Sequence, residues 1–289
     1  SESLTNMTVI NGVQYAMGRW PDKNYNIYET SNGSASITDN ELGTSVNWTG
    51  AEVVIRKNNH SLDRCKITSH SGNTLTYTSL STNQTAFPGY GYFIQNDIKT
   101  LSVYGEWYHD FSSNRFYMFF GGIDPASVTI EVATINSLII NEGYDFLVFD
   151  NLQLHGSISH ATTFLNYTSK SCTIQNSVIS FAGQNGINIL GERNTITNSI
   201  ISDCNQTGIY TVGDYETISG NIIRNIGVLP GQAMDGGLTT GIHVTNNHCL
   251  IKNNTIKNVG YCGITLSSTA DIITIQNNFI HNVLITLND

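Results

Sequence analysis

The chain has 289 residues, of which 39% are hydrophobic and 10% aromatic, so it has enough apolar side chains to bury a core, and intrinsic disorder is excluded. Only 12% of the residues are charged, which is far below the average for globular proteins and excludes a charge-rich helical protein. The net charge of -9 would repel a nucleic-acid backbone, and no stretch is long and apolar enough to span a membrane.

Residues 1–125 are predicted to form a β-rich module. Apolar and polar residues alternate over 52–56, 74–78 and 90–94, and turn signals such as Ser71-Gly72-Asn73 separate these stretches. Two aromatic segments, 105–110 and 115–119, are joined by four residues and are predicted to pair as a hairpin. The expected arrangement of this part is therefore antiparallel.

Residues 126–289 contain an internal repeat. A segment with the pattern Thr-Ile-x-Asn, or a close variant of it, recurs at 173–179, 195–201, 217–223, 250–256 and 274–280. A Gly-Ile pair follows 13 residues later in most copies, whereas the pair at 241–242 comes after 11 additional residues. The repeat therefore has a basic period of 22 residues, and one turn has acquired an insertion at 228–238.

Short strands that recur at this period cannot bury a face alone, so they must stack on their neighbours as a parallel β-solenoid. One isoleucine per coil is expected to form a buried column, made of Ile174, Ile196, Ile218, Ile251 and Ile275. One asparagine per coil is expected to form an amide ladder in a turn, made of Asn176, Asn198, Asn253 and Asn277.

These repeats resemble the right-handed parallel β-helix proteins, the group that includes pectate-lyase-like and polygalacturonase-like carbohydrate enzymes. The Gly-Glu-Trp-Tyr hairpin at 105–119 resembles the β-rich module of secreted bacterial β-helix proteins, several of which are glycoside hydrolases. The resemblance implies an all-β protein, with an antiparallel module at 1–125 and a right-handed β-helix at 126–289 that continues past the last residue. It also implies a secreted or cell-surface monomer whose partner is a polysaccharide, bound on the outer face of the first strand of each coil.

The repeat register predicts which side chains line that outer face. One residue per coil points outward, and the predicted stripe is Asn166, Asn188, Tyr210, His243 and Thr265. Tyr210 and His243 are expected to be neighbours about 5 Å apart, the spacing of paired strands. The insertion at 228–238 ends just before His243, so an acid from this loop is expected to meet the stripe.

Three activities compete for this groove. Glycoside hydrolysis needs two carboxyl groups, for which Asp203 and Asp235 are the first candidates, and Glu192 and Asp214 flank the other side. A polysaccharide lyase needs a base, either Tyr210 or His243, and a cation such as Arg224. A non-catalytic carbohydrate-binding domain needs neither, and the absence of carboxylates from the stripe favours it.

Each candidate also has a structural explanation. Tyr210 and His243 can be a solvated surface pair, and Asp203 can be a turn residue or an ion-pair partner of Arg224. No cofactor is expected. The five cysteines lack metal-ligand spacing, and no cluster of oxygen ligands points to calcium, which remains an alternative source of positive charge.

Overall fold

The computed structural model describes residues 5–59, 61–80, 84–234 and 239–286, which form two compact units. Unit one comprises Ser1–Val9, Glu131–Ala233 and Leu238–Asp289, and unit two comprises Ile10–Ile130 and Met234–Gly237. Each unit is described by itself below. The division into domains 1–125 and 126–289 stays a prediction.

Unit two is an antiparallel β module, as predicted. Its main sheet has the order β3 (Arg19–Trp20), β10 (Gly91–Gln95), β7 (Glu52–Asn58), β8 (Ser61–Ser71), β9 (Thr74–Ser79), β6 (Ser36–Thr38) and β5 (Thr30–Asn32), and β4 (Asn26–Ile27) also pairs with β10. The hairpin consists of β11 (Trp107–Asp110) and β12 (Arg115–Met118). Strand β2 (Val13–Gln14) and two short 3-10 helices, η1 (Ile98–Thr100) and η2 (Pro125–Ser127), also belong to this unit, whereas most of β1 (Thr8–Ile10) and β13 (Ile130–Val132) belongs to unit one.

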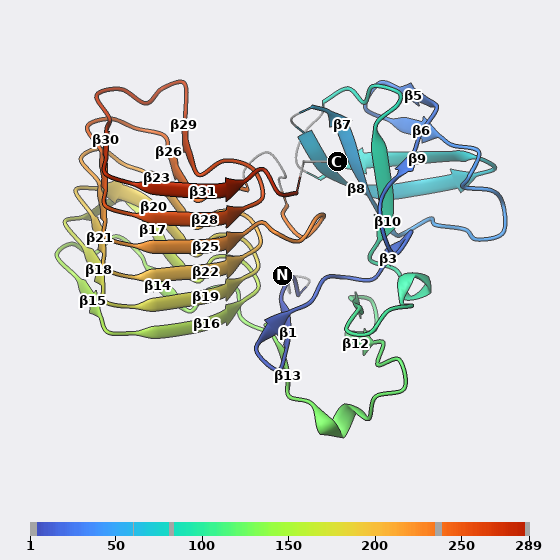
Figure 1. Cartoon of the computed structure of the whole chain (residues 1–289), viewed down its shortest axis with the longest axis horizontal. Coiled ribbons are helices and arrows are strands. Elements are labelled where there is room, and N and C mark those ends of the chain that lie inside the picture. The colour runs from blue at the N-terminus through green and yellow to red at the C-terminus, as the bar shows by residue number, and fades with distance from the viewer. Residues whose placement is uncertain (1–4, 60, 81–83, 235–238, 287–289) are drawn as a thin grey trace. The chain divides into compact units, whose positions relative to one another are not determined.

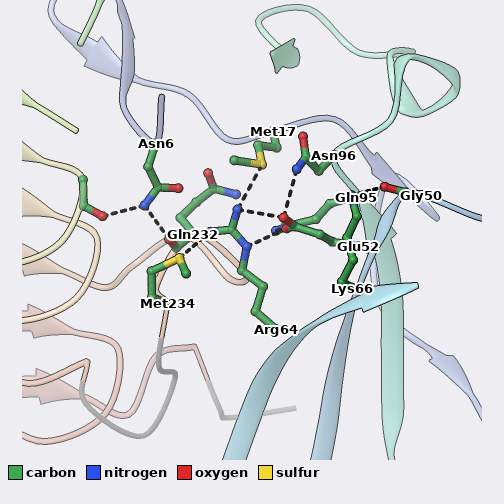
Figure 2. A network of polar contacts seen from close by, with 11 residues as sticks. Asn6, Met17, Gly50, Glu52, Arg64, Lys66, Gln95, Asn96, Gln232 and Met234 are labelled. Carbon is green, nitrogen blue, oxygen red and sulfur yellow. Dashed lines mark hydrogen bonds and ion pairs between the residues drawn. The ribbon is translucent and has the colours of Figure 1, made fainter. Parts of the chain in front are cut away.

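A buried ion pair joins two neighbouring strands of this module. Arg64 Nε on β8 lies 2.6 Å from Glu52 Oε2 on β7, and both side chains are buried (Figure 2). Gln95 and Asn96 donate further hydrogen bonds to the carboxylate. Burial by itself would raise the pKa of Glu52, but Arg64 and these hydrogen bonds lower it below the ordinary value. The buried charge is therefore fully compensated.

Unit one is a right-handed parallel β-helix of six coils, each with three strands (Figure 1). The first sheet contains β14 (Ile139–Asn141), β17 (Thr162–Lys170), β20 (Ile187–Glu192), β23 (Ile209–Val212), β26 (Ile242–Val244) and β29 (Ile264–Leu266). The second sheet contains β15 (Val148–Asp150), β18 (Thr173–Gln175), β21 (Thr195–Thr197), β24 (Thr217–Ser219), β27 (Leu250–Lys252) and β30 (Thr274–Gln276). The third sheet contains β16 (Gln153–Ser157), β19 (Val178–Ala182), β22 (Ile200–Cys204), β25 (Ile222–Ile226), β28 (Thr255–Val259) and β31 (Phe279–Val283).

The predicted isoleucine column is confirmed. The parallel pairing of the second sheet puts Ile174, Ile196, Ile218, Ile251 and Ile275 in one register. The first four are at most 2% exposed, whereas Ile275 in the last coil is 46% exposed. Among the described residues, no strand pairs with β30 on its other side, so coil-on-coil contact is what buries these side chains.

The amide ladder lies one residue further along the chain than predicted. Asn176, Asn198, Asn253 and Asn277 each adopt a positive φ at the turn between the second and third sheets, where asparagine is tolerated better than most residues. The stacked column inside the turn is Ser177, Ser199, Asn221, Asn254 and Asn278. In it, Asn221 Nδ2 donates to Asn254 Oδ1 at 3.0 Å, and Asn254 Nδ2 donates to Asn278 Oδ1 at 2.9 Å.

The burial of the column predicts unequal effects of one substitution at two of its positions. We expect Ile218→Ala to lower the free energy of unfolding by about 2–5 kcal/mol, because it leaves a cavity in a fully buried site. Ile275→Ala, in the same register but half exposed, should cost clearly less. Urea unfolding of both variants measures the difference, and equal losses would contradict the column as a source of stability.

Candidate functional site

The predicted stripe on the first sheet is present over four coils. Parallel pairing aligns Asn188 with Tyr210, Tyr210 with His243, and His243 with Thr265. The ring centroids of Tyr210 and His243 are 5.2 Å apart, with an interplanar angle of 50°. Tyr210 is half-buried and His243 is 9% exposed, so the stripe is a partly sheltered surface rather than a freely solvated one.

Asn166 does not belong to this stripe, and its prediction was wrong. The residue of β17 that pairs with Asn188 is Thr163, because β17 contains extra residues between Phe164 and Ser169 that form a bulge. Asn166 lies in this bulge, where its side-chain amide donates to the Glu142 carbonyl at 2.7 Å. The 25-residue spacing between the paired Phe149 and Ile174 is a sequence signal that could have shown the longer coil.

Two polar residues beside the stripe were missed by the sequence analysis. Asn185 and His160 occupy equivalent positions in successive coils, just before the first sheet begins. The side-chain Nδ2 of Asn185 is 3.4 Å from Asn188 Oδ1, and the backbone N–H of Asn185 donates to His160 Nδ1 at 3.3 Å. Burial lowers the pKa of His160 to about 4, so this imidazole is neutral near neutral pH and can accept that bond. The signal for the position was the Gly-Ile pair that follows Asn185.

The inserted loop is only partly described. Asp235, the first candidate for a catalytic carboxylate, lies outside the described residues. The preceding part of the loop is held against the β-helix by the chain's N-terminal segment. Asn6 Nδ2 donates to the carbonyl oxygens of Gly183 and Gln232, at 2.6 Å and 3.0 Å, and Asn205 Nδ2 donates to the Asn6 carbonyl.

Asp203 lies on a different sheet from the stripe. It is in β22 of the third sheet, has a positive φ, and accepts a hydrogen bond from Asn225 Nδ2 at 2.9 Å. Asn225, Asn258 and Asn282 continue this side-chain ladder through the next coils. Asp203 is therefore neither a turn residue bonded to its own backbone nor, among the described residues, an ion-pair partner of Arg224; it is a strand residue in a side-chain ladder.

Glu192 and Asp214 lie in adjacent coils at the turn between the first and second sheets. Glu192 Oε2 is 3.2 Å from both Lys170 Nζ and Arg193 Nη1. Asp214 Oδ1 accepts from the backbone amide of Asn247 at 2.8 Å. Both carboxylates thus hold neighbouring turns together, one toward the preceding coil and one toward the following coil.

Arg224 does not share a face with Tyr210 and His243, contrary to the expectation for a lyase. It lies in β25 of the third sheet, in register with Ser202 and Lys257. Burial raises the pKa of Tyr210, and the nearby Tyr167 adds to this effect. The phenol is therefore a poor base near neutral pH.

Glu216 is a buried acid that the sequence analysis did not single out. It occupies the inward position of the turn that also contains Asp214, is fully buried, and accepts from Asn194 Nδ2 at 3.1 Å. Burial raises its pKa to about 8, and the charges of Glu192 and Asp214 contribute to the increase. The 22-residue offset between Asn194 and Glu216 was the available signal, since it places both residues in the same inward column.

The described residues contain neither a candidate metal site nor a membrane-spanning helix. No group of three or more His, Cys, Asp or Glu side chains there is placed to hold a metal ion. All five cysteines are free thiols, and four of them are buried. None of the described helices is long and apolar enough to cross a membrane.

Residues 164–286 match the family model described as right handed beta helix region, and no curated protein matches the chain by sequence. A solved chain described as a glycoside hydrolase superposes with a TM-score of 0.72 at 11% identity, over 96% of this chain and 69% of that one. A complex of XylC with xylose has a TM-score of 0.43 at 11% identity, over 92% of this chain and 52% of that one. The tailspike protein gp49 from Pseudomonas phage LKA1 has a TM-score of 0.33 at 13% identity, over 88% and 38%. At 11% identity, the likeness to the first of these structures shows the fold alone.

The raised pKa of Glu216 predicts a pH-dependent stability. The folded state holds this proton more tightly than the unfolded chain, whose carboxyl has the ordinary value of 4.5. The stabilisation is complete below that pH and is lost as the pH rises toward 8, by up to about 1.4 kcal/mol per pH unit. Urea unfolding between pH 4.5 and 8 measures the decline.

Glu216→Gln is the matched variant, because it keeps the acceptor for Asn194 and removes the titration. As the pH rises, the wild type should lose stability relative to the variant. Comparing the two proteins at each pH cancels the contributions of other titrating groups. Parallel stability curves would contradict the buried, protonated carboxyl.

Proposed function

We propose that the chain binds a polysaccharide along the outer face of the first sheet and hydrolyses its glycosidic bonds. The observation that carries the proposal is the stripe Asn188, Tyr210, His243 and Thr265, one side chain per coil in a single register. The stripe runs along the helix axis over several coils, so it suits a linear polymer better than a compact ligand.

The chemistry of the stripe fits sugars. The rings of Tyr210 and His243 are partly sheltered from solvent and offer apolar surface to the faces of pyranose rings. The side chain of Asn188 can donate and accept hydrogen bonds with sugar hydroxyls. Asn185 and the neutral His160 orient the Asn188 end of the stripe. Together these groups bind uncharged polar ligands rather than ions.

Hydrolysis needs an acid and a second carboxylate on either side of the bond. Asp203 and Asp235 remain our candidates, since the loop that contains Asp235 precedes β26 and His243 in the chain. Asp203, in β22 of the third sheet, contributes only if the bound polymer also reaches that sheet and the carboxylate leaves its hydrogen bond with Asn225. A location outside the cell or on its surface, and a monomeric state, are part of this proposal.

A non-catalytic carbohydrate-binding domain is the second candidate function. A specific observation favours it: Asp203, Glu192 and Asp214 are each held in contacts that stabilise turns or ladders. A lyase is less well supported, because its cation Arg224 lies on the third sheet.

A screen of the purified chain on plant, algal and bacterial polysaccharides separates these functions. We expect new reducing ends without the ultraviolet absorbance of an unsaturated sugar. Hydrolysis cleaves the glycosidic bond with water, whereas a lyase cleaves it by elimination and leaves a double bond in the sugar. Reducing ends together with that absorbance would indicate a lyase. Binding without new reducing ends would favour the second candidate.

The carboxylates are tested with isosteric amides on the substrate found. Asp235→Asn should abolish hydrolysis, and Asp203→Asn should reduce it at least about a hundredfold, as expected for a catalytic acid or base. The amide oxygen that Asp203→Asn introduces can still accept the hydrogen bond from Asn225, so the fold is preserved in that variant. Unchanged turnover in both variants would remove the pair from the mechanism.

The stripe itself is tested by affinity. Tyr210→Ala and His243→Ala should each weaken polysaccharide binding about tenfold, equivalent to about 1.4 kcal/mol, because each removes a ring from the binding face. Gln276→Ala, on the exposed face of the second sheet, is the matched control. Isothermal titration with a soluble oligosaccharide measures all three, and equal affinities would place the binding site elsewhere.

A further inference from the structure

The third sheet carries a row of basic side chains on consecutive coils. Parallel pairing aligns Arg224 of β25 with Lys257 of β28, and Lys257 with His281 of β31. Arg224 and His281 are exposed, and Lys257 is half-buried. We call Arg224, Lys257 and His281 the cationic row, whose permanent charges are those of Arg224 and Lys257. The spacing of paired strands puts its members about 5 Å apart.

No side chain in the described part of the chain neutralises Arg224 or Lys257. Across the described residues, neither the Arg224 nor the Lys257 side chain makes an ion pair or a hydrogen bond. The neighbouring acid on this sheet, Asp203, is bound by the amide of Asn225 instead. Like charges directly opposite each other on paired strands destabilise a sheet. The row therefore costs stability in a chain that has only 13 lysines and arginines.

At some other positions the same β-helix avoids this cost. At the turn between the first and second sheets, Lys170 stacks on Glu192 at 3.2 Å, so opposite charges meet in adjacent coils. On the third sheet, the position next to the cationic row is an amide ladder through Asn225 and Asn258. Arg224 and Lys257 have no such partner among the described residues, and an anionic ligand would neutralise them.

A row of mostly apolar side chains, interrupted by Thr255, lies beside the cationic row on the same outer face. Residues two apart in a strand share a face, and two positions before the row the register contains Val178, Ile200, Ile222, Thr255 and Phe279. Ile222 is 40% exposed and Phe279 is 63% exposed. The face therefore offers a line of positive charge next to a line of apolar surface.

We propose that the outer face of the third sheet binds an acidic polysaccharide, with sugar carboxylates on the cationic row and sugar rings against the apolar row. Arg224 can hold a carboxylate through two parallel N–H···O bonds, and Lys257 supplies a point charge one coil away. A linear polymer of uronic acids combines both features, because each sugar unit has one carboxylate and apolar ring faces. The proposal does not depend on the first sheet or on hydrolysis.

A nucleic acid fits this surface less well. Its backbone carries a charge about every 1.7 Å, and a chain with a net charge of -9 would repel it beyond the three residues of the row. An acidic polysaccharide has a lower charge density, and the acids at the turns lie on other faces, where salt screens them over about 10 Å. The experiment must therefore distinguish binding of an acidic polysaccharide from binding of DNA.

The experiment measures the binding of the whole chain to alginate, a linear polymer of uronic acids. The matched probe is the neutral propylene glycol ester of alginate, which keeps the backbone and loses the charge, and double-stranded DNA is the third ligand. We expect binding to alginate that weakens as salt is added, with at least about tenfold weaker binding to the ester and to DNA. Equal binding to the ester, or tighter binding to DNA, would overturn the proposal.

The variants locate the site. Arg224→Gln combined with Lys257→Gln should weaken alginate binding at least about tenfold and reduce its salt dependence. Lys252→Gln is the control for loss of a lysine charge elsewhere, since it removes one positive charge from β27 of the second sheet. It should change affinity less than about twofold. Tyr210→Ala on the first sheet should likewise have no effect, so failure of the function proposed above is distinguishable from failure here.

A folding readout accompanies these measurements. Because the double substitution relieves repulsion between exposed like charges, its thermal unfolding midpoint should equal or exceed that of the wild type. Alginate binding by the folded double variant that matches the binding of Lys252→Gln would overturn the assignment to the cationic row.

Discussion

The stacking of equivalent residues on successive coils is the constraint on which the β-helix depends. A strand of three to six residues buries its inward side chain only because an identical position lies about 5 Å above or below it. Ile218 has such neighbours on both sides and is fully buried, whereas Ile275 pairs on one side only and is half exposed. The burial of each apolar residue is therefore a property of the stack rather than of the individual strand.

The same constraint governs the polar residues. A polar side chain that repeats at strand spacing must be compatible with an identical side chain on the next coil. Amides meet this requirement, because each donates to one neighbour and accepts from the other. The column through Asn221, Asn254 and Asn278 satisfies buried turn groups in this way, and Lys170 with Glu192 does so by opposite charge. Glu216 meets the requirement as a protonated acid, because its pKa is raised by burial. Arg224 and Lys257 do not meet it through any described residue.

Register was the part of the candidate site that could be predicted from the sequence. A period of 22 residues, with one insertion of 11, was enough to bring Tyr210 beside His243, and the structure has their ring centroids 5.2 Å apart. The same arithmetic failed at Asn166, because a bulge in β17 lengthens that coil and shifts every residue beyond it. The repeat period also did not show on which sheet Asp203 and Arg224 lie. Both were expected near a groove on the first sheet, whereas both belong to strands of the third.

The sequence by itself determined the architecture: the β-branched repeat, the Gly-Ile pairs and the low content of charge are local and periodic features, and a stack of coils is the arrangement that buries them. Only the tertiary structure decided which polar groups face one another. Whether a carboxylate is occupied, as Glu192 is by Lys170 and Arg193, or buried, as Glu216 is beside Asn194, depends on the neighbouring coils. Lys170 and Asn194 each lie 22 residues away in the chain from the acid they contact, and side-chain direction and solvent access at each turn are set only when the coils close on one another.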